Sequence, residues 1–284
     1  MGDAVETAAG VVLAGGRSSR MGTSKAALAW HGSTLLHRTT ALLARTVGGP
    51  VVVVRAAGQE LPVLPSGVTV VEDPAPGLGP LQGIAAGLSA VEALAPAAFV
   101  CSTDLPFLHP AFVTRVLDGL GDADVALPVA HGFRQPLAAA YRTGLAGRVA
   151  ALLGAGKRRP GMLFEECHVA ILDEAALLAD PALARLDPGL ESVTNVNEPG
   201  DYAAAAARPA PAVTVECFGT LALDGRRGPR EFAAATLAEA AAAAGIALDR
   251  HVVAAVNGDR MSRDVALPLV AGDTVAFLSA DAGG

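Results

Sequence analysis

The sequence lacks the features that identify disulfide-rich, zinc-binding, membrane-spanning and secreted proteins. Only three of its 284 residues are cysteine, and they lie far apart, so it contains neither a disulfide framework nor a zinc-binding pattern. No apolar run of about 18 residues lacks polar breaks, so we expect no membrane-spanning helix and no membrane partner. The start, MGDAVETAAG, lacks the basic region of a secretory signal. These absences favour a cytoplasmic protein with reduced thiols.

Positive charge is also scarce. The chain has 21 Lys and Arg against 28 Asp and Glu, a net charge of -7. Proteins that bind nucleic acid usually present a basic face, so we expect no nucleic-acid partner. Hydrophobic residues make up 52% of the chain, which is enough for a sizeable core. If such an acidic protein handles anionic ligands, its few cations must be gathered locally.

The first 207 residues alternate short apolar runs with longer helical stretches. The expected strands are 10–14, 51–55, 68–72, 98–102 and 125–128, and the expected helices are 34–45, 82–94 and 110–120. Continuous β-branched runs predict strands buried on both faces of a parallel sheet. The alternation predicts a doubly wound, mostly parallel α/β fold, in which ligands bind at the carboxyl ends of the strands.

A second unit is expected at 213–284, after a proline- and alanine-containing linker at 208–212. Its expected strands are 213–218, 252–256 and 274–278, its expected helix is 236–245, and Asn257-Gly258 is a hairpin signal. One helix crossing a short mixed sheet predicts a small α+β fold of the β-grasp, or ubiquitin-like, type. The sequence ends in Gly283 and Gly284, which have no side chains.

A glycine-rich segment follows the first expected strand. It contains Leu13, Ala14, Gly15, Gly16, Arg17, Arg20 and Lys25. Its glycines allow the backbone N–H groups to approach phosphate oxygens closely, and its three cations have no acidic residue among them. The pattern predicts a phosphate-binding loop, although the G-x-x-x-x-G-K-[ST] motif is absent. The alternative is a basic loop that only contacts solvent.

Three later segments place polar side chains at strand ends or in extended backbone. Asp73 follows the strand at 68–72, with Gly79 shortly after it, and is suited to accept hydrogen bonds from a nucleotide; the alternative is a helix cap. Asp104 follows the strand at 98–102 and is the expected magnesium ligand, since Mg²⁺ binds one or two carboxylates plus substrate phosphates. Asn197 is a candidate second oxygen ligand, and its alternative is a plain turn.

Together these motifs resemble those of the molybdenum cofactor guanylyltransferases. The matching segments, within about residues 9–205, are Leu13-Ala14-Gly15-Gly16, Arg20-Met21-Gly22, Lys25, Asp73, Gly79-Pro80-Leu81, Asp104-Leu105-Pro106, Gln135-Pro136-Leu137 and Asn195-Val196-Asn197. The resemblance implies that the phosphate of molybdopterin carrying molybdenum attacks the α-phosphorus of GTP and that pyrophosphate leaves. It also implies that Leu13, Ala14, Gly15, Lys25 and Asp73 contact the nucleotide, that Arg17 and Arg20 bear on the triphosphate, and that Asp104 holds magnesium.

The residues fit this chemistry without the resemblance. A phosphate nucleophile is already anionic at neutral pH, so the barrier lies in bringing anions together and stabilising the leaving pyrophosphate. Arg20, Lys25 and Asp104 with its metal are therefore the expected catalytic groups. A related cytidylyltransferase, or a transferase acting on another phosphate such as a sugar 1-phosphate, remains an alternative. Cytidylyltransferases tend to open with Leu-Ala-Ala-Gly, so the opening motif here favours guanine.

The second unit resembles the small sulfur-carrier subunit of molybdopterin synthase. The resemblance rests on Val253–Gly258, Gly272–Leu278 and the Gly283-Gly284 tail. It implies that Gly284 is adenylylated and converted to a thiocarboxylate. The implied partners are the large synthase subunit and an adenylylating and sulfurating enzyme, with molybdoenzyme maturation proteins further on. The alternatives are a small β domain used for docking, or a chain that is mainly a carrier.

Overall fold

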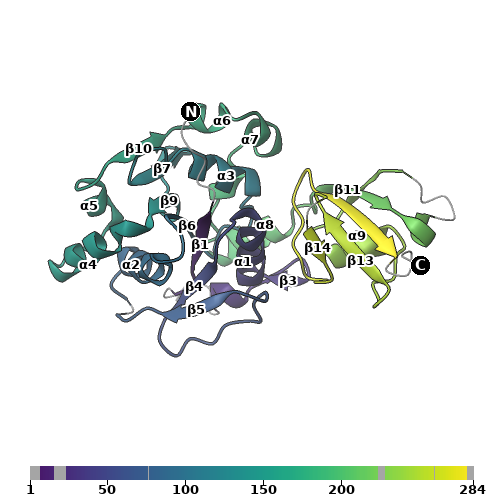
Figure 1. The fold of residues 1–284 in the computed structure, drawn as a ribbon, viewed down its shortest axis with the longest axis horizontal. Coiled ribbons are helices and arrows are strands. Elements are labelled where there is room, and N and C mark those ends of the chain that lie inside the picture. Colours follow the sequence, from purple (N-terminus) through teal and green to yellow (C-terminus); the bar gives the residue numbers. More distant parts are fainter. Residues whose placement is uncertain (1–6, 16–23, 76, 223–227, 259, 280–284) are drawn as a thin grey trace. The chain divides into compact units, whose positions relative to one another are not determined.

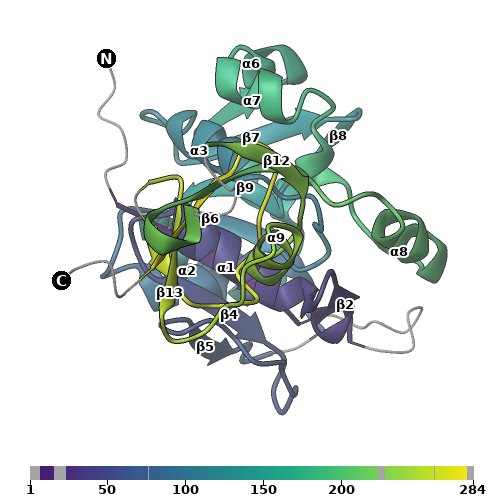
Figure 2. The same ribbon diagram turned by 90° about the vertical axis from the view of Figure 1, so that its right-hand side faces the viewer.

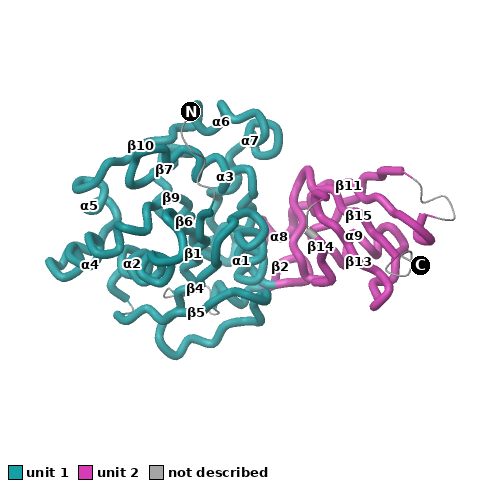
Figure 3. The backbone as a smooth tube through the Cα atoms, in the orientation of Figure 1, with its two compact units in different colours: residues 1–28, 34–202 teal, residues 29–33, 203–284 magenta. Residues whose placement is uncertain are grey.

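The structure is a computed structural model that describes residues 7–15, 24–75, 77–222, 228–258 and 260–279. The chain divides into two compact units (Figure 3). The first comprises residues 1–28 and 34–202, and the second comprises residues 29–33 and 203–284. The domain boundaries expected at 207 and 213 remain a prediction.

The first unit is built on an eight-stranded sheet (Figure 1). The strands follow the order β10-β7-β9-β6-β1-β4-β5, and β8 pairs with β7 off this path. Their bounds are β1 Ala8–Leu13, β4 Val51–Arg55, β5 Thr69–Glu72, β6 Ala97–Ser102, β7 Val125–Ala130, β8 Phe133–Arg134, β9 Ala138–Arg142 and β10 Val169–Leu172. The pairs β6–β1, β1–β4, β4–β5 and β7–β10 are parallel, whereas β9 runs antiparallel between β6 and β7. The sheet is therefore mostly parallel, as the sequence predicts.

Helices cover both faces of this sheet. The helices of this unit are α1 Leu35–Thr46, α2 Pro80–Val91, α3 Pro110–Asp118, α4 Ala146–Gly154, α5 Pro160–Phe164, α6 Glu174–Leu178 and α7 Pro181–Leu186, and α8 Pro199–Ala206 follows across the division between the two units. Short 3-10 turns lie at η1 Lys25–Ala27, η2 Thr143–Leu145 and η3 Glu191–Val193, and β2 Ala29–Trp30 pairs with β3 Ser33–Thr34. Figure 2 shows α6 and α7 close to each other near β7.

Two apolar clusters show which helices belong to which face. Val12 of β1 packs in a cluster with residues of α1 and α3, such as Leu43 and Phe112. Its neighbour Val11 packs in the other cluster, with residues of α2 and α4 such as Leu88. Successive side chains of a strand point to opposite faces, so this alternation requires a core on each side. The layout is doubly wound, as predicted.

The five predicted strands and three predicted helices of this unit are present, with ends shifted by a few residues. One expectation is wrong in its burial: β5 is not buried on both faces. It forms the edge of the sheet, and its Val70 side chain is 38% exposed. A run of β-branched residues reveals a strand but not its position in the sheet, and an edge strand has a partner on one side only.

The second unit contains a five-stranded mixed sheet in the order β12-β11-β15-β13-β14. Its elements are β11 Ala212–Cys217, η4 Gly219–Ala222, β12 Arg230–Ala233, α9 Leu237–Ala243, β13 Val252–Val256, β14 Arg260–Ser262 and β15 Thr274–Ser279. The first and last strands, β11 and β15, are parallel neighbours, and the other pairs are antiparallel. Leu237, Ala240 and Ala241 of α9 pack in the same cluster as Val275 and Phe277 of β15.

The hairpin signal in this unit is confirmed. Asn257 and Gly258 both have positive φ, at 55° and 82°, and they connect the antiparallel strands β13 and β14. The Asn257 side chain also donates to Asp273 Oδ1 over 2.9 Å and accepts from the Thr274 amide over 2.9 Å, so the turn is tied to the start of β15.

None of the helices among the described residues is both long and apolar enough to cross a bilayer.

Candidate active site

The candidate site lies where β1 and β6 end side by side. Leu13, the last residue of β1, pairs with Ser102, the last residue of β6. The buried Thr103 hydroxyl donates to the Leu13 carbonyl over 3.1 Å, which fixes the two strand ends to each other. The chain then turns, and Asp104 follows with its side chain 16% exposed. The parallel register therefore delivers a carboxylate directly beside the segment that follows β1.

Lys25 joins this carboxylate to a distant part of the chain. Its Nζ lies 2.8 Å from Asp104 Oδ2 and 2.8 Å from Asn197 Oδ1. The other oxygen of Asp104, Oδ1, accepts a short hydrogen bond from the Ser102 hydroxyl. Asn197 is brought here because the amide of the neighbouring Val196 donates to the Asp104 carbonyl over 3.0 Å. Two oxygen ligands thus converge on one cationic nitrogen.

This convergence bears on the metal expected from the sequence. Carboxylate and amide oxygens are the ligands that Mg²⁺ uses, and here both lie within hydrogen-bond distance of a cation. Among the described residues, no group of three His, Cys, Asp or Glu side chains comes together to hold a metal. A metal at Asp104 and Asn197 would need further oxygens from substrate phosphates, which is the usual arrangement for Mg²⁺. The residues present fit that ion.

Asp73 lies at the carboxyl end of β5 and is partly buried. Its amide donates to the Arg55 carbonyl over 2.7 Å, and its Oδ1 accepts from the Ala75 amide over 2.9 Å. It stabilises its own turn, whereas the N-cap of α2 is Gly79 with φ 93°. The simple alternative, in which Asp73 caps the following helix, is therefore wrong.

Leu13 and Ala14 are each only 8% exposed, so any ligand there would meet mainly their backbone. Gly15 is exposed. A side chain at position 15 would place its Cβ 3.1 Å from the Ala56 nitrogen, a tight contact, so the glycine allows this close approach. Gly16, Arg17, Arg20 and the tail residues Gly283 and Gly284 lie outside the described residues, and their predicted roles stay predictions.

Two features of this region were missed by reasoning from the sequence. The first is Gln59, whose carboxamide contacts the end of β1. The second is the basic run at 157–159, because a Cβ at Gly79 would lie 3.3 Å from the Arg158 carbonyl oxygen. Arg158 and Arg159 are exposed, and Lys157 is paired with Glu166, which raises the Lys157 pKa. The run of three cations was a visible signal, but nothing in the sequence placed it beside Gly79.

Cys101, which precedes Ser102, is not part of this chemistry. It is fully buried in the core, and burial raises the pKa of its thiol far above the usual range, with the nearby charge of Asp104 adding to the effect. His109 is the N-cap of α3, where its Nδ1 accepts from the Ala111 amide over 3.0 Å. No disulfide joins any of the three cysteines, all of which lie in the described part of the chain.

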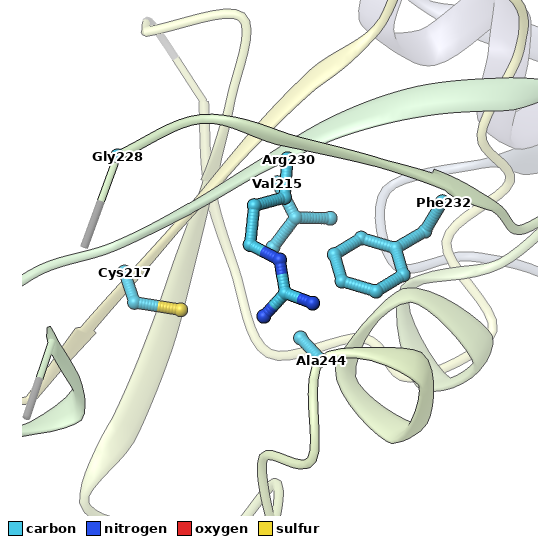
Figure 4. A pocket seen from close by; sticks show the side chains of 6 residues that line it. All are labelled: Val215, Cys217, Gly228, Arg230, Phe232 and Ala244. Carbon is cyan, nitrogen blue, oxygen red and sulfur yellow. The ribbon is translucent and has the colours of Figure 1, made fainter. Parts of the chain in front are cut away.

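Figure 4 shows a separate small pocket within the second unit. It is lined by Val215, Cys217, Gly228, Arg230, Phe232 and Ala244. The Arg230 guanidinium lies over the Phe232 ring, 5.2 Å from its centroid. None of the residues that the sequence predicts to bind nucleotide or metal lines this pocket.

Comparison with known proteins identifies a family for more than half of the chain. A family model described as "MobA-like NTP transferase domain" matches residues 10–169, which include most of β1 and the residues Lys25, Asp73 and Asp104. The chain belongs to the MobA-like NTP transferase family. It is an enzyme with a nucleotidyltransferase fold. Asn197 lies beyond the matched segment, and its contact with Lys25 is shown by the structure.

Particular relatives support this membership. The chain is 44% identical to the probable molybdenum cofactor guanylyltransferase of Mycobacterium tuberculosis H37Rv over 166 residues, which are 55% of this chain and 79% of that protein. The molybdopterin-guanine dinucleotide biosynthesis protein A of Archaeoglobus fulgidus has a similar structure, with a TM-score of 0.54 at 22% identity, covering 70% of this chain and 96% of that one.

A cytidylyltransferase acting on methylerythritol phosphate, from Thermus thermophilus, is similar to nearly the same degree. Its TM-score is 0.52 at 21% identity, over 69% of this chain and 96% of that one. Members with different bases and acceptors thus share the fold of this MobA-like NTP transferase. The fold alone does not select the base.

Proposed function

We propose that the first unit transfers GMP from GTP to the phosphate of molybdopterin carrying molybdenum and releases pyrophosphate. The observation that carries the proposal is the convergence of Asp104 and Asn197 on the Lys25 ammonium at the ends of β1 and β6. The name of the mycobacterial relative, at 44% identity, supports guanine and the molybdenum cofactor. The opening Leu13-Ala14-Gly15-Gly16 motif points the same way.

The proposed transfer requires that the two substrates be positioned and that their negative charge be neutralised, and it does not require a strong base. An oxygen of the acceptor phosphate attacks the α-phosphorus, a new P–O bond forms, and the bond to the β-phosphate bridging oxygen breaks. The Lys25 ammonium would neutralise charge on the triphosphate. The sequence predicts the same role for Arg17 and Arg20. Fixed cations stabilise developing charge without having to reorganise during the reaction.

Asp104 and Asn197 are the residues that would hold Mg²⁺. When bound with the nucleotide, the ion would supply Lewis-acid stabilisation of phosphate oxygens. Asp104 is prepared for this role because the Ser102 hydroxyl and the Thr103–Leu13 contact hold its turn in place. The side chain of Lys25 would then exchange its two protein oxygens for phosphate oxygens.

We assign the basic run at 157–159 to the acceptor. It lies beside Gly79 at the start of α2, where the exposed Arg158 and Arg159 offer guanidinium groups suited to a phosphate. The triphosphate already has three cations in the segment after β1, so a second group of cations suits a second anionic substrate. Leu13, Ala14, Gly15, Asp73 and Gly79 complete the proposed nucleotide contacts.

Pyrophosphate release with each nucleoside triphosphate in turn tests this function. The assay contains Mg²⁺ and molybdopterin carrying molybdate, with sugar 1-phosphates as the comparison acceptors. Release with GTP, dependent on the molybdenum-bearing acceptor, is the expected result. Release only with CTP would mean that the nucleotide substrate is CTP rather than GTP, while the proposed mechanism would stand. Release only with a sugar 1-phosphate would show that the proposed acceptor is wrong.

For residues 213–284, which follow a linker at 208–212 and make up most of the second unit, we propose a β-grasp sulfur carrier. The support is the order of its mixed sheet, with the first and last strands as parallel neighbours and α9 packed against it. Its partners would be the large subunit of molybdopterin synthase and an enzyme that adenylylates and sulfurates Gly284. Molybdoenzyme maturation proteins would receive the finished cofactor, and the cytoplasm would be the site of both activities.

The carrier role needs a free C-terminus. Mass spectrometry of the chain after incubation with ATP, a sulfide donor and an enzyme that adenylylates and sulfurates Gly284 should show one oxygen of the Gly284 carboxylate replaced by sulfur, with pyrophosphate and AMP released. A variant with residues appended after Gly284 should show none. Sulfur transfer by the extended, untrimmed chain would refute this role and leave the transferase proposal intact.

A further inference from the structure

Gln59 lies in the turn that follows β4 and reaches across to the end of β1. Its Nε2 donates to the Ala14 carbonyl over 2.9 Å and lies 3.4 Å from the Ser24 hydroxyl. Its Oε1 accepts from the Ala56 amide over 3.0 Å. One partly buried carboxamide therefore joins its own turn to Ala14 and Ser24, which precede it by 45 and 35 residues.

Two of these segments belong to the proposed nucleotide site. Ala14 precedes Gly15, and Ser24 directly precedes Lys25. Ser24 is the N-cap of η1, but its side chain makes no capping hydrogen bond, and its hydroxyl faces Gln59 instead. The same carboxamide thus contacts the residue before Gly15 and the residue before Lys25.

The turn that carries Gln59 is itself fixed by Arg55. Nη1 of Arg55 donates to the Gln59 carbonyl over 3.0 Å, and Nη2 donates to Glu72 Oε1 over 2.8 Å. The Arg55 carbonyl accepts from the Asp73 amide over 2.7 Å. The ends of β1, β4 and β5 are therefore connected through one chain of hydrogen bonds, which runs from Asp73 to Ala14.

We propose that Gln59 is a positioning residue for the nucleotide. Its carboxamide fixes the Ala14–Gly15 backbone and the approach to Lys25 at the spacing that the nucleoside triphosphate requires. Holding both in place before binding lowers the ordering cost of the complex. The inference rests on the proposed function, because it takes the residues after β1 as the nucleotide-binding segment. It adds a residue that acts through Ala14 and Ser24 rather than by touching substrate.

The effect should fall on nucleotide binding. Without the carboxamide, the Ala14 carbonyl and the Ser24 hydroxyl lose a shared partner, and the backbone at these two residues must be ordered by the nucleotide instead. The acceptor site proposed at Arg158 and Arg159 shares no hydrogen bond with Gln59 among the described residues. Nucleotide affinity should change, while acceptor affinity should not.

Two variants test the inference. Gln59→Met keeps the length of the side chain and removes both hydrogen-bonding groups. Gln59→Glu keeps the oxygen that accepts from Ala56 but removes the donor to Ala14. The neighbouring Glu60, which is exposed, provides Glu60→Gln as the control in the same turn. Calorimetric titration with GTP gives nucleotide affinity, steady-state kinetics give KM for each substrate and kcat, and thermal unfolding reports stability.

Both Gln59 variants should weaken GTP binding and raise its KM roughly tenfold, because GTP must then order the backbone that the lost hydrogen bonds had held. The acceptor KM and kcat should stay within about twofold, as should every constant of Glu60→Gln. If Gln59→Met does not fold, Gln59→Glu carries the same expectation. Unchanged GTP affinity in a folded variant, or equal losses for GTP and acceptor, would overturn the inference.

The wild-type reaction separates this inference from the proposed function. If the wild-type chain transfers GMP and the variants bind GTP normally, the role of Gln59 is wrong and the function stands. If the wild-type chain binds GTP but transfers nothing, and the variants bind GTP less tightly, the function is wrong and the role of Gln59 stands.

Discussion

The Lys25 ammonium lies 2.8 Å from Asp104 Oδ2, so the proposed phosphate-binding cation is paired with the proposed metal ligand. Asn197 Oδ1 contacts the same ammonium. The Lys25 ammonium therefore contacts both of the oxygen atoms that we propose as metal ligands. A metal ion that uses these oxygens must compete with it, and phosphate oxygens of an arriving nucleotide would draw it away. If Asp104 and Asn197 hold the metal as proposed, metal binding and nucleotide binding would be coupled through this one side chain.

Replacing Lys25 should strengthen metal binding by the nucleotide-free protein. Lys25→Met removes the competing cation and leaves Asp104 without that partner, so Mn²⁺ affinity should rise by about fivefold, in line with a partly exposed ion pair. Electron paramagnetic resonance titration with Mn²⁺ measures this directly. Lys157→Met, which removes a lysine paired to Glu166 elsewhere, serves as the control. Weaker Mn²⁺ binding in Lys25→Met would contradict the competition.

The basic run beside Gly79 should affect the acceptor. The double variant R158A/R159A should raise the KM for the molybdenum-bearing acceptor by roughly tenfold, because two phosphate-binding guanidinium groups are lost. The KM for GTP should change little. Arg185→Ala, which removes an exposed arginine from α7, is the matched control. A rise confined to the KM for GTP would indicate that these arginines contact the nucleotide and not the acceptor.

Asp273 should matter for the stability of the second unit. It is 3% exposed and accepts from the Asn257 side chain over 2.9 Å and from the Val270 amide over 2.8 Å. Asp273→Ala leaves both donors without this partner, which should cost about 2–3 kcal/mol of unfolding free energy. Hydrogen exchange of the β13 amides in increasing urea measures the loss locally. Glu231→Gln, on an exposed residue of β12, should match the wild type, and equal protection in Asp273→Ala would refute the role.

The strand ends of the first unit were predictable from the sequence because buried parallel strands are short apolar runs followed by polar residues. Asp104 was identified in this way, since it follows one of these runs directly. The contact between Lys25 and Asn197 spans 172 residues, so only the folded chain shows it. Asn197 could be named as a candidate ligand because its amide oxygen suits a metal, but its partner could not be named.

Gln59 and Arg158 were missed for a different reason. Gln59 acts through side-chain hydrogen bonds to backbone atoms of other segments, which leave no pattern in the residues around it. Arg158 was missed because the approach of its carbonyl to Gly79 depends on how the chain before α5 packs against the start of α2. The half-exposed β5 was misjudged because its composition matches that of a central strand, and only the sheet order places it at the edge.

We propose that nucleotidyl transfer takes place at the carboxyl ends of β1 and β6, with Asp104 as the metal ligand. The most direct measurement is pyrophosphate release from GTP with Mg²⁺ and the molybdenum-bearing acceptor, for the wild type, Asp104→Asn and the exposed control Asp118→Asn. We expect the wild type and Asp118→Asn to turn over equally, and Asp104→Asn to lose about 100-fold or more while unfolding at an unchanged temperature. An active, well-folded Asp104→Asn enzyme would contradict the account.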